Sequence, residues 1–134
     1  MNSRLRRFDG GVTAAKGFLA AGVSAGLKKR GKDLALIVNS GGAVPAVGAF
    51  TSNLVKGAPV YVTMKRMERG RIAAIVANSG YSNVLTGERG IRDAEKMAEL
   101  TAEELGLEKE EVAVASTGVI GRYLPMDRIE NGIR

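Results

Sequence analysis

Hydrophobic and polar residues follow patterns along this chain that predict strands first and helices later. Residues 18–27 alternate weakly, although the spacing of 19, 23 and 27 also suits a helix. Because Gly17, Gly22 and Gly26 disfavour a helix, we expect a strand there. A second apolar run at 34–38 is expected to pair back on the first, because the intervening segment 28–33, centred on a glycine, is typical of a turn. After a glycine pair, a third strand is expected at 46–51.

The middle of the chain carries a helix start and a further apolar run. Pro59 suits the first turn of a helix, and Gly70 suits its end. The apolar residues expected on one face of this helix are Val60, Met64 and Met67. Alternation over residues 60–64 also permits a strand, so both interpretations stay open here. Residues 72–77 predict a buried strand, followed by a polar loop over residues 78–90.

The clearest predicted element is a helix over residues 91–105, ended by Gly106. Its apolar stripe consists of Ile91, Ala94, Ala98, Thr101, Ala102 and Leu105. A short strand is expected at 112–115, and Pro125 begins a last helix. The spaced apolar residues of that helix are Met126, Ile129 and Ile133. Because the chain stops in a helix that has barely begun, we expect residues 1–134 to be a single partial domain.

Composition then excludes several chemistries. The chain has no histidine and no cysteine, so it cannot form a Ser-His-Asp or Cys-His arrangement, a disulfide or a zinc site of the usual kind. The lack of cysteine fits a cytoplasmic location. The sequence contains neither a phosphate-binding P-loop nor a complete dinucleotide-binding glycine motif. With 18 glycines and only 4% aromatic residues, the core must consist of Ala, Val, Ile and Leu in closely packed backbones.

The formal charge of +6 raises the question of an anionic partner. The basic residues form three clusters: Arg4, Arg6 and Arg7; Lys28, Lys29, Arg30 and Lys32; Lys65, Arg66, Arg69 and Arg71. Few aromatic side chains are present to stack on bases, so we do not expect nucleic-acid binding. A mild positive field suits small anionic substrates better. No apolar run reaches the ~20 residues that span a bilayer, so no membrane partner is expected.

Two polar segments carry the candidate chemistry. The segment 78–83 (Asn-Ser-Gly-Tyr-Ser-Asn) could bind substrate through amides and hydroxyls, or could simply satisfy its own backbone in a turn. The segment 116–121 (Ser-Thr-Gly-Val-Ile-Gly) could aim a Thr117 hydroxyl and a backbone N–H at an oxygen that bears negative charge. On local pattern alone, a glycine turn after a strand is the more common reason for such a segment. A chain without histidine and cysteine would stabilise charge there and would not attack.

The order of short motifs along the chain resembles the bifunctional ornithine acetyltransferase, or glutamate N-acetyltransferase, family of arginine biosynthesis. The motifs that carry this resemblance between residues 11 and 133 are GVTAAKGF at 11–18, AAGV at 20–23, KDLALIV at 32–38, AFTSN at 49–53, APV at 58–60, NSG at 78–80, TGE at 86–88, STGVIG at 116–121 and LPM at 124–126. Each motif is weak alone, and their order and spacing make the resemblance specific.

The resemblance implies a precursor that cuts itself before an internal threonine, which becomes the first residue and nucleophile of a β chain. It implies acetyl transfer from N-acetylornithine to glutamate, with acetyl-CoA as a donor in some members, and no cofactor or metal. The α chain would supply an oxyanion hole, at positions that match Thr117 and Gly118 here. The implied fold is α/β, with strands between helices and a sheet completed by the β chain, in an α2β2 assembly.

Two departures from the family pattern leave an alternative open. The family loop usually reads N-S-G-N-A-N-x-x-T-G, whereas Tyr81 and Ser82 replace the second Asn and the Ala here. The chain also ends before the self-cleavage site and the nucleophilic threonine, so we expect it to be inactive alone. A non-catalytic binding or interaction module on the same scaffold is the alternative function. A related self-processing aminopeptidase is a weaker one.

Overall fold

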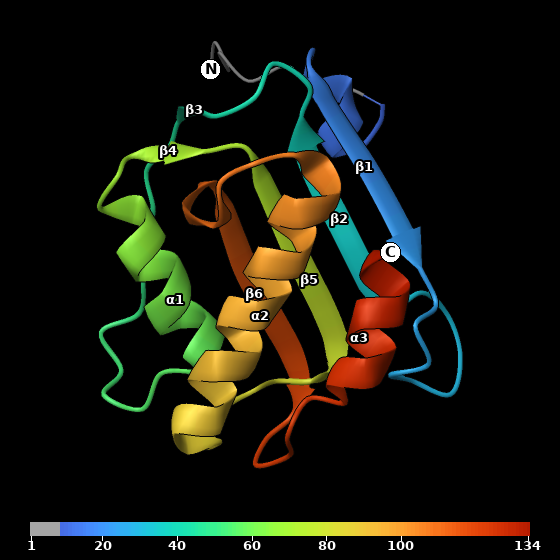
Figure 1. Ribbon diagram of the computed structural model, residues 1–134, viewed down its shortest axis with the longest axis vertical. Helices are drawn as coiled ribbons and strands as arrows, with labels where there is room; N and C mark the ends of the chain where they lie inside the picture. The colour runs from blue at the N-terminus through green and yellow to red at the C-terminus, as the bar shows by residue number, and fades with distance from the viewer. Residues whose placement is uncertain (1–8) are drawn as a thin grey trace, which may run out of the picture.

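Four strands form one mixed sheet, in the order β1-β2-β5-β6, in the computed structural model, which describes residues 9–134 (Figure 1). These strands are β1 (Phe18–Val23), β2 (Leu34–Asn39), β5 (Ala74–Tyr81) and β6 (Val112–Val119). The helices are α1 (Ala58–Met67), α2 (Gly87–Leu105) and α3 (Met126–Ile133), with short 3-10 turns η1 (Val12–Ala14) and η2 (Lys109–Glu111). Two-residue strands β3 (Val44–Pro45) and β4 (Arg71–Ile72) pair separately. The expected mixed α/β class is confirmed.

The N-terminal hairpin forms as the sequence predicts, but β1 ends at Val23, before the end of the strand expected at 18–27. β1 and β2 pair antiparallel, so that Leu19 lies opposite Val38 and Val23 opposite Leu34. The glycine-centred turn between them places Gly31 at φ +78°, a backbone conformation that glycine adopts without steric cost. β2 then pairs antiparallel with β5, and β5 pairs parallel with β6.

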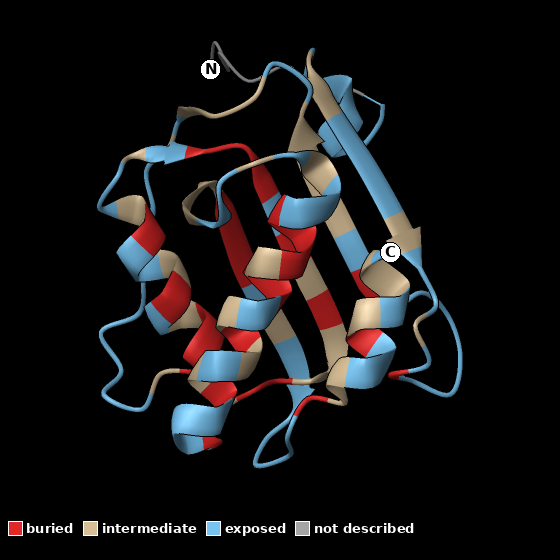
Figure 2. Ribbon diagram, in the orientation of Figure 1, coloured by how far each residue is buried: buried red, intermediate tan, exposed pale blue. Residues whose placement is uncertain are grey.

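The hydrophobic core lies between one face of the sheet and helices α2 and α3 (Figure 2). The buried sheet residues are Leu34, Ala74, Val76, Val112 and Val114, and the buried α2 residues are Ala94, Met97, Ala98, Leu100 and Ala102. Alanines along α2 allow the helix axis to lie close to the sheet. The core therefore consists of the small aliphatic residues that the composition requires.

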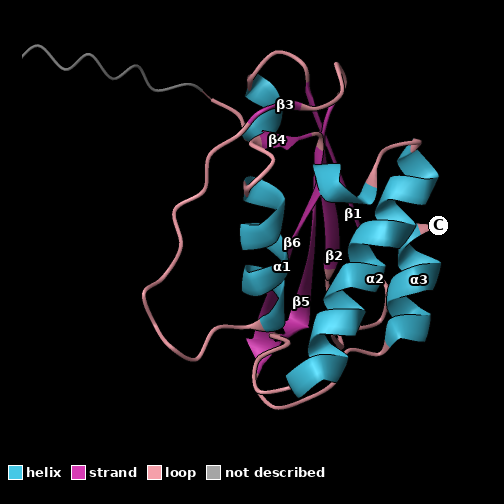
Figure 3. Ribbon diagram, turned by 60° about the vertical axis from the view of Figure 1, so that its left-hand side comes forward, coloured by secondary structure: helices cyan, strands magenta, loops and turns pink. Residues whose placement is uncertain are grey.

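The other face of the sheet, away from α2 and α3, carries no α-helix within residues 9–134 except α1 at its β6 edge, and we call it the helix-free face (Figure 3). Its residues alternate with the core residues along each strand, as the period of two requires. Ala20 lies opposite Ile37, and Ile37 lies opposite Ile75. Ile75 is 40% exposed, and Ala115 on β6 is also exposed. This helix-free face therefore carries small and apolar side chains, of which Ile75 and Ala115 are exposed whereas Ala113 is buried.

Helix α1 lies along β6, the outer strand of the sheet (Figure 3). Pro59 falls in its first turn and Gly70 follows its end at φ +64°, so the helix is confirmed over the alternative strand. The expected apolar face is wrong, however. The buried residues of α1 are Ala58, Pro59, Val62 and Arg66, while Met64 is 37% exposed. The helix packs against β6 and α2, and the side that it turns toward them cannot be read from the local pattern of apolar residues.

The third strand expected at 46–51 does not form. Only Val44–Pro45 pairs, with β4, and the residues that follow form an exposed loop in which Val47 is fully exposed. A strand needs a partner along its length, and here the backbone bond from Ala46 N–H to the Gly70 carbonyl is the last of the β3–β4 ladder. The apolar composition of the segment therefore does not place it in a sheet.

The polar loop expected from Asn78 to Gly90 is also shorter than predicted. β5 continues to Tyr81, and α2 begins at Gly87. The strand extends because each residue from Asn78 to Tyr81 has a register partner on β6, from Ser116 to Val119. Backbone pairing over a long sequence separation thus overrides the local preference of these polar residues for turns.

Candidate functional site

Thr117 and Gly118 lie near the carboxyl end of β6, beside the same end of β5, at the lower edge of the molecule in Figure 1. In the parallel register, Ser79 is the partner of Thr117, and Gly80 is the partner of Gly118. The two polar segments that the sequence presents separately are therefore neighbours. The sequence predicts each segment but not their contact, because parallel pairing is not visible in local patterns.

Successive side chains on β6 point to opposite faces of the sheet. The Ser116 hydroxyl points into the interior, where its Oγ is buried without a hydrogen-bond partner among the described residues. Thr117 is exposed, and it belongs to the same alternation as Ala115 on the helix-free face. The Thr117 hydroxyl is therefore accessible to a ligand or a partner chain that approaches this face.

Gly118 lies directly against the backbone of Gly80. A Cβ atom added to Gly118 would lie 2.3 Å from the Gly80 carbonyl carbon, and Gly118 has φ +132°. A Cβ added to Gly80 would in turn lie 2.9 Å from the Leu27 carbonyl oxygen. Three backbone segments thus approach one another at this point, and only glycine at positions 80 and 118 permits it.

The segment that follows Gly118 is fixed by the loop after β5. The carbonyl of Val119 accepts a hydrogen bond from the Ser82 N–H at 3.0 Å and another from the Ser82 hydroxyl at 2.9 Å. The Gly121 N–H donates to the Val84 carbonyl at 2.9 Å. The Thr117–Gly121 backbone is therefore held on both sides of Ile120.

Asn83 is a structural residue of this loop. It is fully buried at φ +51°, its Nδ2 donates to the Gly90 carbonyl, and its Oδ1 accepts from the Thr86 hydroxyl. A Cβ on Gly90 would lie 2.0 Å from Thr86 Oγ1, so a glycine is required there. These side chains satisfy hydrogen-bonding groups of the loop and of the first turn of α2. The turn interpretation of this segment therefore holds for Ser82 and Asn83, whose polar groups are used within the chain.

Asp33 is a buried carboxylate at the end of the turn that the sequence predicts between the first two strands. Its two oxygens accept backbone N–H bonds from Ala25, Leu27 and Lys28 at 2.6, 2.7 and 2.9 Å, and its carbonyl accepts from the Ser79 N–H. Burial would raise the pKa of this carboxyl, but these N–H donors and the Lys28 charge outweigh burial, and the pKa is lowered. Asp33 therefore fixes the Leu27 carbonyl against Gly80.

Asp93 on α2 has the opposite electrostatics. Its side chain is 14% exposed, and burial raises the pKa of its carboxyl, although the charges of Arg89 and Arg92 act against that rise. Asp93 Oδ2 lies 3.8 Å from Arg89 Nε, and the Arg89 guanidinium lies 4.1 Å from the centre of the Tyr123 ring. This pair of contacts connects α2 to the loop that follows β6.

The basic clusters do not form a single surface. The cluster at 28–32 is an exposed loop, whereas Arg66 is buried and pairs with Glu95. Arg69 pairs with Glu108. The cluster at 4–7 lies outside the described residues. Within residues 9–134, no group of three acidic residues is placed to hold a metal ion, and no helix is long and apolar enough to cross a membrane.

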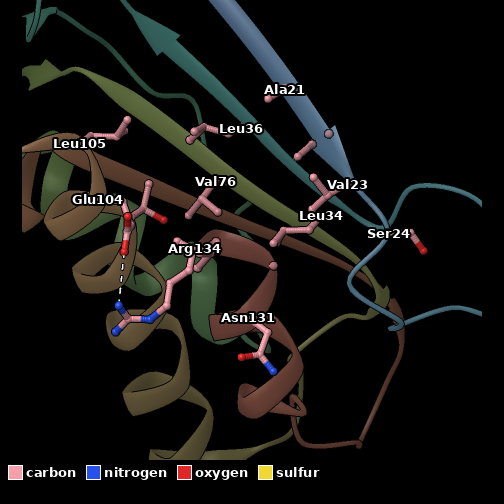
Figure 4. A pocket seen from close by; sticks show the side chains of 15 residues that line it. Ala21, Val23, Ser24, Leu34, Leu36, Val76, Glu104, Leu105, Asn131 and Arg134 are labelled. Atoms are coloured by element: carbon pink, nitrogen blue, oxygen red, sulfur yellow. Dashed lines mark hydrogen bonds and ion pairs between the residues drawn. The ribbon is translucent and has the colours of Figure 1, made fainter.

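A pocket of about 420 Å³ opens elsewhere, between the β1–β2 hairpin and helices α2 and α3 (Figure 4). Its floor is apolar, with Leu34, Leu36 and Val76 among the lining residues, and the Glu104–Arg134 ion pair lies at its rim. The pocket is on the helix-covered face, and neither Thr117 nor Gly118 lines it. It is therefore separate from the candidate site.

The fold and the site define a mixed α/β protein in which a threonine and a glycine lie near the carboxyl end of one strand, beside the same end of a parallel neighbour. The family model described as the ArgJ family matches residues 19–134. The arginine biosynthesis bifunctional protein ArgJ of Symbiobacterium thermophilum is 55% identical over a 130-residue alignment that covers 93% of this chain and 32% of that protein. The glutamate N-acetyltransferase of Methanothermobacter thermautotrophicus is 51% identical over 126 residues, 94% of this chain and 30% of that protein.

Solved structures agree with these sequence relatives. The ornithine acetyltransferase of Mycobacterium tuberculosis, solved in complex with ornithine, matches with a TM-score of 0.89 and 46% identity, over 92% of this chain and 67% of that one. ArgJ of Bacillus halodurans matches with a TM-score of 0.86 and 47% identity, over 93% of this chain and 65% of that one. The chain belongs to the ArgJ family, whose named members are acetyltransferases of arginine biosynthesis. It spans about a third of the length of these curated relatives.

Proposed function

We propose that this chain is the α-chain portion of an acetyltransferase that moves an acetyl group from N-acetylornithine to glutamate, and that Thr117 and Gly118 form its oxyanion hole. The observation that carries this proposal is the accessible Thr117 hydroxyl beside Gly118 at the carboxyl end of β6, in a chain of the ArgJ family. Residues 1–134 would then be one partial domain of a longer protein.

The proposed chemistry assigns one role to this chain. A threonine hydroxyl from the β chain attacks the acetyl carbonyl of N-acetylornithine, and the carbonyl oxygen becomes an oxyanion in the tetrahedral intermediate. The Thr117 hydroxyl and the Gly118 N–H would donate hydrogen bonds to that oxyanion. Collapse of the intermediate leaves an acetyl-threonine ester and releases ornithine, whose amine takes up the proton lost by the threonine hydroxyl. The glutamate amine then attacks the ester, which forms N-acetylglutamate and releases the threonine hydroxyl. Removal of one oxyanion donor typically lowers turnover by about 10²–10³.

The helix-free face of the sheet supports the need for a second chain. Ile75 on this face is 40% exposed, and Thr117 is presented on the same side. A β chain that packs there would cover the apolar residues and bring its first threonine to Thr117. The α2β2 assembly and the use of acetyl-CoA as a second donor belong to the same proposal. A cytoplasmic location stays a prediction.

A non-catalytic interaction module on the same scaffold is the alternative. It is favoured by Tyr81 and Ser82, which depart from the usual family loop, and by the use of Ser82 and Asn83 for internal hydrogen bonds. Those bonds leave fewer groups free for a substrate. The alternative requires neither acetyl transfer nor a β chain that begins with threonine.

Expression of the full-length protein that contains this chain, followed by intact mass measurement and an acetyl-transfer assay, tests the proposal. We expect two polypeptides, the second beginning with threonine, and transfer of acetyl from N-acetylornithine to glutamate. This chain expressed alone is the control and should show no transfer. A single uncut polypeptide without transfer activity would support the interaction module and contradict the acetyltransferase.

A further inference from the structure

We propose that Ser82 is a positioning residue for the Thr117–Gly118 donor pair, an inference that rests on the function proposed above. Ser82 donates twice to one acceptor: its N–H and its hydroxyl bond the Val119 carbonyl at 3.0 and 2.9 Å. A carbonyl oxygen has two lone pairs. Ser82 therefore occupies the full hydrogen-bonding capacity of the Val119 carbonyl and fixes both its position and its direction.

Ser82 stands on a rigid support. It is 8% exposed, and its neighbour Asn83 is fully buried and bonded to both Thr86 and Gly90. The Asn83 carbonyl also accepts the Ala58 N–H at 3.0 Å, at the start of α1. The loop that carries Ser82 is thus hydrogen-bonded to helices α1 and α2. The Ser82 contact therefore holds β6 against a fixed part of the fold.

The Val119 carbonyl belongs to the second peptide unit after the one that carries the Gly118 N–H, so the Ser82 contact fixes the backbone directly after the donor pair. Gly118 has little room to adjust, because it lies against Gly80 on one side. The next fixed point is the Gly121 N–H, bonded to the Val84 carbonyl. The donor pair is therefore held between the β5 contact behind it and the Ser82 contact ahead of it.

Loss of the Ser82 hydroxyl should loosen the donor pair without unfolding it. The backbone bond from Ser82 to Val119 would persist in Ser82→Ala, so the strand stays paired while the carbonyl gains freedom to rotate. Donor groups act on an oxyanion only when they are held close to the productive geometry. Because the oxyanion exists in the tetrahedral intermediate and not in the bound substrate, we expect a lower kcat and an unchanged KM.

The test compares Ser82→Ala with Ser40→Ala in the full-length enzyme. Ser40 is a matched control, because its hydroxyl also donates to a backbone carbonyl, that of Gly17, at 3.1 Å, far from the site. We expect kcat to fall about fivefold to tenfold in Ser82→Ala, the size of one neutral hydrogen bond, and to stay unchanged in Ser40→Ala. Amide hydrogen exchange in the 116–121 peptide should rise only in Ser82→Ala.

A double variant with Thr117→Val separates this inference from the proposed function. If Ser82 acts through the donor pair, the combined loss in kcat is smaller than the product of the two single losses. A combined loss in kcat equal to the product of the two single losses would overturn the positioning role. So would equal kcat and equal exchange in Ser82→Ala and Ser40→Ala. If Thr117→Val itself leaves transfer unchanged, the proposed oxyanion role fails. The exchange measurement still shows, independently of that failure, whether the Ser82 hydroxyl holds the 116–121 backbone.

Discussion

The hydroxyl of Thr63 and the backbone of Val114 exchange two hydrogen bonds at the outer edge of the sheet. The Val114 N–H donates to Thr63 Oγ1 at 2.9 Å, and the Thr63 hydroxyl donates to the Val114 carbonyl at 2.8 Å. β6 is an edge strand, whose outward backbone groups need partners when they are buried. Val114 is 4% exposed, so one side chain from α1 closes the edge of the strand that carries the candidate site.

Thr63→Val should destabilise the chain because it keeps the shape of the side chain and removes both bonds. Two buried backbone groups would lose their partner, at a cost of about 1–3 kcal/mol each. Thr101→Val is the control: Thr101 is also buried, but its hydroxyl donates to the Met97 carbonyl within helix α2, where the helix provides the main bond. Denaturant unfolding should show a clear loss for Thr63→Val and a small one for Thr101→Val. Equal losses would contradict the edge-closing role.

Asp33→Asn should lower stability at neutral pH and flatten its dependence on acid. The folded-state pKa of Asp33 lies below its unfolded value, because three N–H donors favour the carboxylate. Its contribution is therefore complete above the unfolded pKa of about 3.9 and is lost as pH falls through the lower folded value. We expect Asp33→Asn to unfold more easily at pH 7 by about 2 kcal/mol.

The check on Asp33 is a series of unfolding measurements between pH 7 and pH 2. The difference in free energy of unfolding between the wild type and Asp33→Asn should stay constant down to about pH 4 and shrink below it. A difference that stays constant to pH 2 would show that the carboxylate charge does not hold the 24–32 loop.

Asp93→Asn should instead raise the stability of the chain at neutral pH. Burial raises the folded-state pKa of Asp93 above its unfolded value, so the carboxylate opposes folding at neutral pH. The neutral amide removes that penalty, and we expect a gain in melting temperature at pH 7 that disappears as pH falls through the folded pKa. Calorimetry at pH 7 and pH 4 measures both values. A loss of stability at pH 7 would show that the contact with Arg89 outweighs burial.

Gly118→Ala should disrupt the site backbone, whereas Gly121→Ala should be tolerated better. Both glycines have positive φ, at +132° and +75°, so both substitutions introduce strain of about 1–2 kcal/mol. Only Gly118 also meets the Gly80 backbone, at 2.3 Å from an added Cβ, while nothing lies within 4 Å of one added to Gly121. Unfolding experiments should show a larger loss for Gly118→Ala. Equal losses would remove the close approach as the reason for glycine at position 118.

The parts of the fold that the sequence predicts are those set by local pattern. The β1–β2 hairpin and helix α2, with its stop at Gly106, follow from alternation, helical spacing and glycine position. The strand expected at 46–51 failed because apolar residues alone do not supply a pairing partner. The extension of β5 through Asn78–Tyr81 was missed because it depends on register with β6, about 38 positions later in the chain.

The site shows the same division. The sequence and the family resemblance single out Thr117 and Gly118, which lie near the end of β6, and their role stays a prediction. The roles of Ser82 and Asn83 could not be predicted from local pattern. Ser82 acts through a contact with Val119, far along the chain, and Asn83 through a contact with Gly90 across a turn. Asp33 gave no signal beyond a turn-type residue before a strand, although it supports the Leu27 contact with Gly80.

Turnover of Thr117→Val against Thr117→Ser in the full-length enzyme tests the central claim most directly. Valine keeps the branched shape without the hydroxyl, and serine keeps the hydroxyl without the methyl group. If the Thr117 hydroxyl stabilises the oxyanion, kcat for acetyl transfer to glutamate falls by about 10²–10³ in Thr117→Val and stays near wild type in Thr117→Ser, with KM unchanged in both. Wild-type kcat in a correctly assembled Thr117→Val enzyme would contradict the account.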